Sequence, residues 1–184
     1  MRRLLSRLRW FSRREEGTVI VEAVVVLPML LWATFALFAF WDAYKSINTV
    51  QKASYTVSDM LSRRMDPVTM TDLSGLRDVM NFLLDEDQTA RMRVTSVTWS
   101  EANNRFEVLW SKSPDATLAE LTTETLQSYT TYIPAMSDGD TVVVVEAIVG
   151  FTPAFDVGLN NLNITEFIVT RPRLAPRVCF DICA

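Results

Sequence analysis

The sequence predicts an α+β fold, in which one long N-terminal helix precedes a small domain with an antiparallel sheet of about four strands and one or two covering helices. Three observations predict it. Residues 18–41 form an apolar run with a single charge, and a helical spacing of three and four continues beyond that run to residue 64. The two-residue alternation typical of strands appears only after residue 90. A chain of 184 residues has room for one such helix and one small core.

The apolar run is long enough to cross a membrane. At about 1.5 Å per residue, residues 18–41 span roughly 35 Å as a helix, more than the hydrocarbon thickness of a bilayer. We therefore expect a transmembrane helix over 18–41 and an extension of the same helix over 42–65. The extension carries a narrow stripe at helical spacing, formed by Tyr44, Ile47, Val50, Ser54, Val57 and Leu61.

The charges are distributed unevenly and predict a topology. Residues 1–17 have a net charge of +4, and the rest of the chain has −8. Basic residues beside a span favour the cytoplasmic side, so we expect residues 1–17 inside and the domain outside. The arginines lie where topology requires them, which argues against nucleic-acid binding. They are Arg2, Arg3, Arg7, Arg9, Arg13 and Arg14.

A cleaved secretory signal is the alternative interpretation of this N-terminal region. The apolar core of such a signal is about 7–15 residues long and is followed by a small-x-small cleavage site. The run over 18–41 is longer, and no convincing site of that kind lies between residues 35 and 43. We therefore expect the helix to be retained as an anchor.

The region over 66–184 has the patterns of a compact α+β domain. A Thr69-x-x-Asp72 capping signal follows Asp66-Pro67 and predicts a helix over about 71–85. Leucine spacing predicts a second helix over 117–130. Alternating or continuous apolar segments predict four strands, over 91–99, 105–111, 141–151 and 164–171, of which 141–151 is expected to be central.

The residues needed for common enzyme chemistry are missing from the sequence. The chain has no histidine, which removes the commonest general base and the usual hydrolase triads, and its five glycines form no phosphate-binding loop. We expect no enzymatic activity, no cofactor and no metal site. Acidic pairs such as Asp85/Asp87 and Asp138/Asp140 are interpreted as solvated turns.

Cys179 and Cys183 are the only cysteines, and both lie near the C-terminus. On the outer side of a membrane, an oxidising compartment favours a disulfide between them. The short loop predicts a modest entropic gain, and the main effect would be to hold the tail. Free thiols or intermolecular bonds are the alternative.

Glu22 and Pro28 are the unusual residues of the apolar run. An ionisable group inside a span is costly and is rarely present without a partner or function. Alternatively, Glu22 lies close enough to the cytoplasmic interface to reach headgroups or water. Pro28 removes one helical hydrogen bond and favours a kink, which need have no function of its own.

The segment from Arg13 through Gly17 to Glu22, followed by the apolar run, resembles the processing site of type IV prepilins and pseudopilins. The longer string Glu16-Gly17-Thr18-Val19-Ile20-Val21-Glu22-Ala23-Val24-Val25-Val26-Leu27-Pro28 is similar to the TadE-like proteins of the tight-adherence (Tad/Flp) pilus system. The resemblance covers residues 13–35. It implies that a prepilin peptidase cuts after Gly17, which makes Thr18 the first mature residue and Glu22 the fifth.

The same resemblance implies a role and partners. Glu22 would pair with the new N-terminal amine of its own or a neighbouring subunit and set the register between subunits. The partners would be the membrane, the prepilin peptidase, other Tad pilus subunits and inner-membrane assembly proteins. The location would be the bacterial inner membrane, with a pilin-like domain in the periplasm. The chain differs from the bulk Flp pilins, which are much smaller and usually have tyrosine where Ala23 stands, so a minor pilin or pseudopilin is expected.

An alternative function stays open from the sequence. The chain would then be an unprocessed single-pass periplasmic binding or scaffold protein, which keeps its arginine arm and uses Glu22 to contact a membrane partner. The state of the N-terminus distinguishes the two functions.

Overall fold

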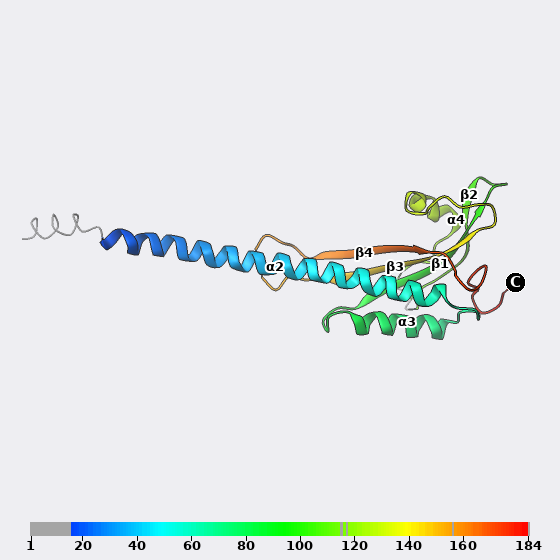
Figure 1. The fold of residues 1–184 in the computed structure, drawn as a ribbon, viewed down its shortest axis with the longest axis horizontal. Helices are drawn as coiled ribbons and strands as arrows, with labels where there is room; N and C mark the ends of the chain where they lie inside the picture. Colours follow the sequence, from blue (N-terminus) through cyan, green and yellow to red (C-terminus); the bar gives the residue numbers. More distant parts are fainter. Residues whose placement is uncertain (1–15, 115, 117, 156, 184) are drawn as a thin grey trace, which may run out of the picture. The chain divides into compact units, whose positions relative to one another are not determined.

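The computed structural model describes residues 16–114, 116, 118–155 and 157–183, with side chains from residue 20 onward. The predicted leader over 1–17, with all six of its arginines, lies outside these residues apart from Glu16 and Gly17. Figure 1 shows the order of the elements along the chain. They are α2 (Glu16–Ser62), α3 (Met70–Leu83), β1 (Ala90–Ser100), β2 (Arg105–Lys112), α4 (Thr123–Leu126), the 3-10 helix η1 (Gln127–Tyr132), β3 (Thr141–Phe151) and β4 (Leu162–Thr170).

The expected α+β class, with one long apolar N-terminal helix and a four-stranded antiparallel sheet, is confirmed. The strand order is β2-β1-β3-β4, and every neighbouring pair is antiparallel. β3 pairs with β1 on one side and β4 on the other, so the prediction of a central strand over 141–151 is confirmed. Its run of four valines has the continuous apolar character of a strand covered on both faces.

One face of the sheet is covered by α4, η1 and the segments around them. Val97 of β1, Phe106 of β2 and Val144 of β3 form a buried cluster there with Leu126 of α4 and Ile133. Trp99 meets Phe106 edge to face, with ring centroids 4.8 Å apart, and Tyr129 stacks on Phe167 at 5.3 Å. These aromatic pairs add directional packing to the burial of apolar area.

The other face is covered by α3 and by the part of α2 that belongs to the same compact unit, residues 43–62 (Figure 1). α3 buries Leu73, Leu76 and Met80. The buried face of α2 is made mostly of small side chains, which are Ala43, Ser46, Val50, Ala53, Ser54, Val57, Ser58, Leu61 and Ser62. Small residues let a helix backbone approach the sheet closely.

Local chemistry explains where α3 begins. The Thr69 hydroxyl accepts a hydrogen bond from the Asp72 backbone N–H, and the Asp72 carboxylate accepts one from the Thr69 N–H at 3.0 Å. This reciprocal arrangement is a capping box, as the sequence predicted. The observed helix, Met70–Leu83, lies within two residues of the expected bounds.

Of the helix expected over 117–130, only the part from Thr123 onward is helical. Residues 118–122 are not helical; four residues of α-helix follow Thr122, and the 3-10 helix η1 continues to Tyr132. The segment is rich in threonine and serine, whose hydroxyls bond to nearby carbonyls: Ser128 donates to Thr125 and Thr130 donates to Gln127. Such local bonds compete with regular helix. β4 spans Leu162–Thr170 and so begins two residues before the strand expected over 164–171.

Candidate functional site

The residues singled out near the N-terminus all lie in α2. Gly17 and Thr18 are part of this helix, and so are Glu22 and Pro28. Glu22 is exposed, and among the described residues it has no hydrogen bond or ion pair. The helix therefore brings the four predicted residues onto one element but supplies no described partner for the carboxylate.

The apolar side chains around Glu22 are exposed as well. Met29 is 72% exposed and Leu37 is 74% exposed, and all large apolar residues from Ile20 to Phe35 are at least 43% exposed. Only 6% of the most apolar 18-residue window of this helix is buried. A core helix of the folded domain would be mostly buried, so this segment requires another apolar surrounding. Within the described residues, this one helix is long and apolar enough to cross a membrane.

The apolar groove beside Pro28 and the Glu22 side chain lie on opposite faces of the helix. A shallow apolar groove is lined by Ile20, Ala23, Val24, Leu27 and Pro28, which share one face at spacings of three and four. At about 100° per residue, Glu22 points to the opposite side, in line with Val26 and Met29. The helix can therefore meet one neighbour through its acid and another through its groove.

Pro28 changes the backbone within this groove. Proline has no N–H, so it donates nothing to the carbonyl of Val24, one turn earlier. α2 continues on both sides of Pro28, so the helix is not broken there, and the kink stays a prediction. Further along, the Thr34 hydroxyl donates to the carbonyl of Leu30 at 2.8 Å, which satisfies a polar group inside the apolar segment.

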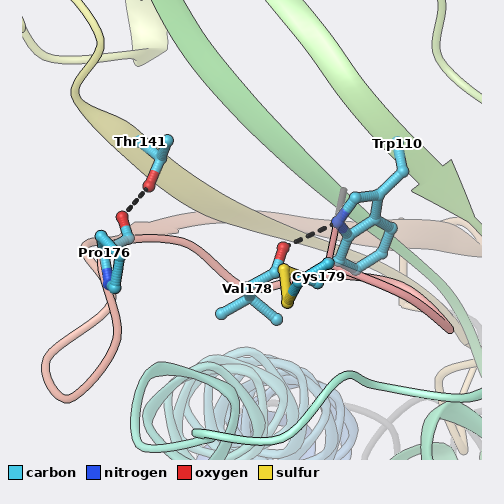
Figure 2. The surroundings of a disulfide bond; sticks show 6 residues. Trp110, Thr141, Pro176, Val178 and Cys179 are labelled. Atoms are coloured by element: carbon cyan, nitrogen blue, oxygen red, sulfur yellow. Dashed lines mark hydrogen bonds between the residues drawn. A yellow bond between two sulfur atoms is a disulfide. The ribbon is translucent and has the colours of Figure 1, made fainter.

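Cys179 and Cys183 form a disulfide in the C-terminal tail, with their Cα atoms 5.2 Å apart. Figure 2 shows how the residues around it are attached to the sheet. The indole N–H of Trp110 donates to the carbonyl of Val178 at 2.8 Å, and the Thr141 hydroxyl donates to the carbonyl of Pro176 at 2.6 Å. The tail is thereby attached to β2 and β3.

The tail is also hydrogen-bonded to the end of α2 and to the segment that connects α2 with α3. Val68 exchanges backbone hydrogen bonds with it, donating to the Cys179 carbonyl at 2.9 Å and accepting from the Asp181 N–H at 3.0 Å. Arg173 N–H donates to the carbonyl of Ser62 at the end of α2. The Phe180 ring lies 5.5 Å from that of Trp110. The disulfide therefore lies in a segment that ties helix ends to strands.

One buried ion pair was missed by the sequence analysis. Arg93 of β1 and Glu146 of β3 are side by side in the sheet and bonded to each other, and their side chains are only 8% and 7% exposed. Arg93 also donates to the carbonyl of Ala119. The sequence offered a weak signal, since Glu146 interrupts the otherwise apolar run of β3, but no local pattern relates residues 53 positions apart.

Among the residues that the structure describes, three carboxyl groups outside the apolar segment have shifted pKa values, and each shift has a local cause. Hydrogen bonds from the Thr69 backbone and side chain lower the pKa of Asp72, helped by Arg64. A hydrogen bond from Thr122 lowers the pKa of Glu124 at the start of α4. Burial raises the pKa of Glu166 in β4. These shifts come from helix capping and partial burial.

The described residues contain no group of three or more histidine, cysteine, aspartate or glutamate side chains placed to hold a metal ion. The features that stand out are the exposed apolar helix with its single acid and the disulfide-closed tail. No protein-family model, curated protein or solved structure matches the chain.

Proposed function

We propose that the chain is a TadE-like minor pilin or pseudopilin, cut after Gly17 by a prepilin peptidase and then used to assemble a Tad/Flp adhesive pilus of the type IVb class. The observation that carries the proposal is the spacing of Gly17, Glu22 and Pro28 at the start of an apolar helix whose side chains are exposed. Glycine gives a peptidase an unhindered backbone because it has no Cβ.

Cleavage would give Glu22 the partner that it lacks among the described residues. The new α-amino group of Thr18 would carry a positive charge about one helical turn from the Glu22 carboxylate. In an apolar surrounding, an ion is tolerated when an opposite charge lies beside it. The amine can come from the same subunit or from its neighbour, and the second case would fix how far one helix is shifted along the next.

The groove beside Pro28 supports the same proposal. A helix that carries an acid on one side and an apolar groove on the other can pack between two neighbours in a bundle. In the proposed arrangement, the helix lies in the inner membrane, the arginine-rich leader is cytoplasmic until it is removed, and the α+β domain is periplasmic. The partners are then the peptidase, other pilus subunits and the membrane-embedded assembly proteins.

The decisive experiment is to determine the N-terminus of the membrane-extracted protein. We expect intact mass and N-terminal sequencing to show a mature chain that begins at Thr18 when a prepilin peptidase is co-expressed, and the full chain when it is not. A Met1 terminus in peptidase-positive cells would contradict the proposal and favour the unprocessed scaffold protein.

Two variants separate processing from assembly. Gly17→Ala should block or slow cleavage, because the added Cβ obstructs the peptidase. Glu22→Ala should still be cleaved but should assemble poorly, as measured by the amount of the chain recovered with other pilus subunits. Val26→Ala is the matched control, since it lies one turn further on the same face and leaves the charge in place. Normal assembly of Glu22→Ala would remove the pairing role.

A further inference from the structure

The loop between β3 and β4 lies against the apolar part of α2. Residues 153–159 of this loop and the helix up to Asp42 form one compact unit. The contact between them is aromatic: the ring of Phe155 lies 5.1 Å from the ring of Phe35, at an interplanar angle of 41°. Phe35 belongs to the exposed apolar segment that requires an apolar surrounding.

The sequence of the loop fits an apolar surrounding. Residues 152–160 read Thr-Pro-Ala-Phe-Asp-Val-Gly-Leu-Asn, with Asp156 as the single charge. Phe155 is still 40% exposed after its contact with Phe35, and Ala154 is exposed too. The helix therefore covers only part of the Phe155 ring, and the rest of the ring is open to the surroundings.

The backbone of the loop turns tightly. The Val157 N–H donates to the carbonyl of Phe155 at 3.1 Å, and Gly158 has a φ of +92° that a residue with a side chain rarely adopts. Backbone groups bonded within a turn are easier to bring close to lipid than unpaired ones. The Phe155 side chain is thus exposed on a loop in which the Phe155 carbonyl already accepts a hydrogen bond.

The position of Phe35 along the helix sets the depth at which the Phe155 ring would lie in a bilayer. Trp41 and Asp42 mark the outer end of the apolar run, and tryptophan favours the headgroup level. Phe35 precedes Trp41 by six residues, which is about 9 Å along a helix axis. A ring in contact with Phe35 must therefore lie below the headgroups if the helix spans the bilayer.

We propose that the β3–β4 loop is a second membrane contact, in which Phe155 enters the outer lipid leaflet beside Phe35. This rests on α2 spanning a membrane, as in the proposed function, but it does not depend on cleavage or pilus assembly. The loop would fix how deeply the outer end of the helix sits and would resist its sliding through the bilayer. The partner is lipid acyl chains.

The test measures depth in the full chain, reconstituted in vesicles of phosphatidylethanolamine and phosphatidylglycerol. A nitroxide spin label is attached to single cysteines introduced by Ala154→Cys, Ala102→Cys or Leu37→Cys, while Cys179 and Cys183 remain bonded to each other. Ala154 adjoins Phe155, Ala102 is another exposed alanine, in the β1–β2 turn, and Leu37 lies within the apolar run. Collision with dissolved oxygen reports lipid, and collision with a water-soluble nickel chelate reports solvent.

We expect the label at residue 154 to prefer oxygen over the nickel chelate, as at residue 37, and the label at residue 102 to show the reverse. Adding Phe155→Asp to Ala154→Cys should reverse the preference at 154, whereas adding Phe155→Leu should preserve it. A solvent-exposed label at 154 with a lipid-exposed label at 37 would overturn the loop contact alone. Solvent exposure at both positions would overturn the span as well, and with it the membrane part of the proposed function.

Discussion

The two halves of α2 are both helical, but the first exposes bulky apolar side chains and the second buries mostly small ones. From Ile20 to Phe35, every large apolar side chain is exposed. Over residues 43–62, the buried positions are alanine, serine and valine with a single leucine, Leu61. The more hydrophobic half is thus the one that the protein itself does not cover.

The difference shows that each half is adapted to another surrounding. In the proposed membrane arrangement, the first half can have bulky apolar residues because lipid, or apolar neighbours within it, accommodates them without close fitting. The second half has small residues because it packs closely on the sheet. Its serines are satisfied there: Ser54 donates to the Val50 carbonyl at 2.8 Å, and Ser58 bonds to the Thr170 hydroxyl of β4 at 2.5 Å.

The largest expected effect compares two acids in apolar surroundings, Glu146 in the sheet and Glu22 in the exposed half of α2. Glu146→Ala leaves the buried guanidinium of Arg93 without its partner, and breaking a pair of this kind costs about 3–5 kcal/mol. Glu22→Ala should leave the free energy of unfolding of the domain unchanged. Urea unfolding of the full chain in mild detergent, followed by pulse proteolysis, measures both.

The control for this comparison removes both charges. Arg93→Met combined with Glu146→Leu should recover much of the stability, because replacing a buried pair by apolar residues of similar size is often close to neutral. If Glu146→Ala alone proved neutral, the pair would not be a buried structural element, and the contrast with Glu22 would disappear.

The second comparison uses the same substitution in each half of α2. Leu61→Ala removes a side chain that is 0% exposed, and large-to-small changes at such sites cost about 2–5 kcal/mol. Leu30→Ala removes one that is 61% exposed, and it should not change the unfolding midpoint of the domain. The same urea unfolding experiment measures the stability of both variants. Equal losses from both variants would show that the first half also packs on protein within the single chain.

Much of the fold could be predicted because its signals are local. The apolar run and the continuing period of three and four indicated α2, the Thr69–Asp72 signal indicated the start of α3, and alternation indicated the four strands. The leucine spacing over 117–130 predicted a longer α-helix than the structure contains. The threonines and serines between these leucines favour local hydrogen bonds instead. Periodicity alone does not weigh that competition.

Contacts between distant segments could not be predicted in the same way. The pairing of Arg93 with Glu146 depends on the register of β1 against β3, and the bond from Trp110 to Val178 joins residues 68 positions apart. Within the candidate site, the spacing of Gly17 and Glu22 was visible from the sequence. The contact of Phe155 with Phe35 was not, because nothing local indicates where a loop will lie.

A third comparison exchanges small polar residues for a bulky one. Thr34 and Ser54 each donate a hydroxyl hydrogen bond to the carbonyl four residues earlier, at 2.8 Å, but Thr34 is exposed and Ser54 is fully buried. Ser54→Leu overfills a close contact and should cost about 1–3 kcal/mol. Thr34→Leu should be tolerated by the domain and should strengthen retention in detergent-free vesicles. A stable Ser54→Leu variant, measured in the same unfolding series, would refute close packing of the second half.

The smallest expected effect concerns pH, to which the capped helix α3 should respond while the apolar half of α2 does not. The hydrogen bonds from Thr69 lower the pKa of Asp72 below its ordinary value of 3.8, so the folded state favours the carboxylate. The stabilisation is therefore present above pH 3.8 and is lost as the pH falls through the lower pKa of the folded state. Asp72→Asn should lower the free energy of unfolding by up to about 1 kcal/mol at neutral pH, typical of a helix cap, and the difference from the wild type should shrink in acid.

Asp78→Asn, on the exposed surface of the same helix, is the matched control and should change the free energy of unfolding by less than about 0.5 kcal/mol. Vesicle retention should be equal for all three proteins, because retention depends on the first half of α2 and the domain's stability depends on contacts elsewhere.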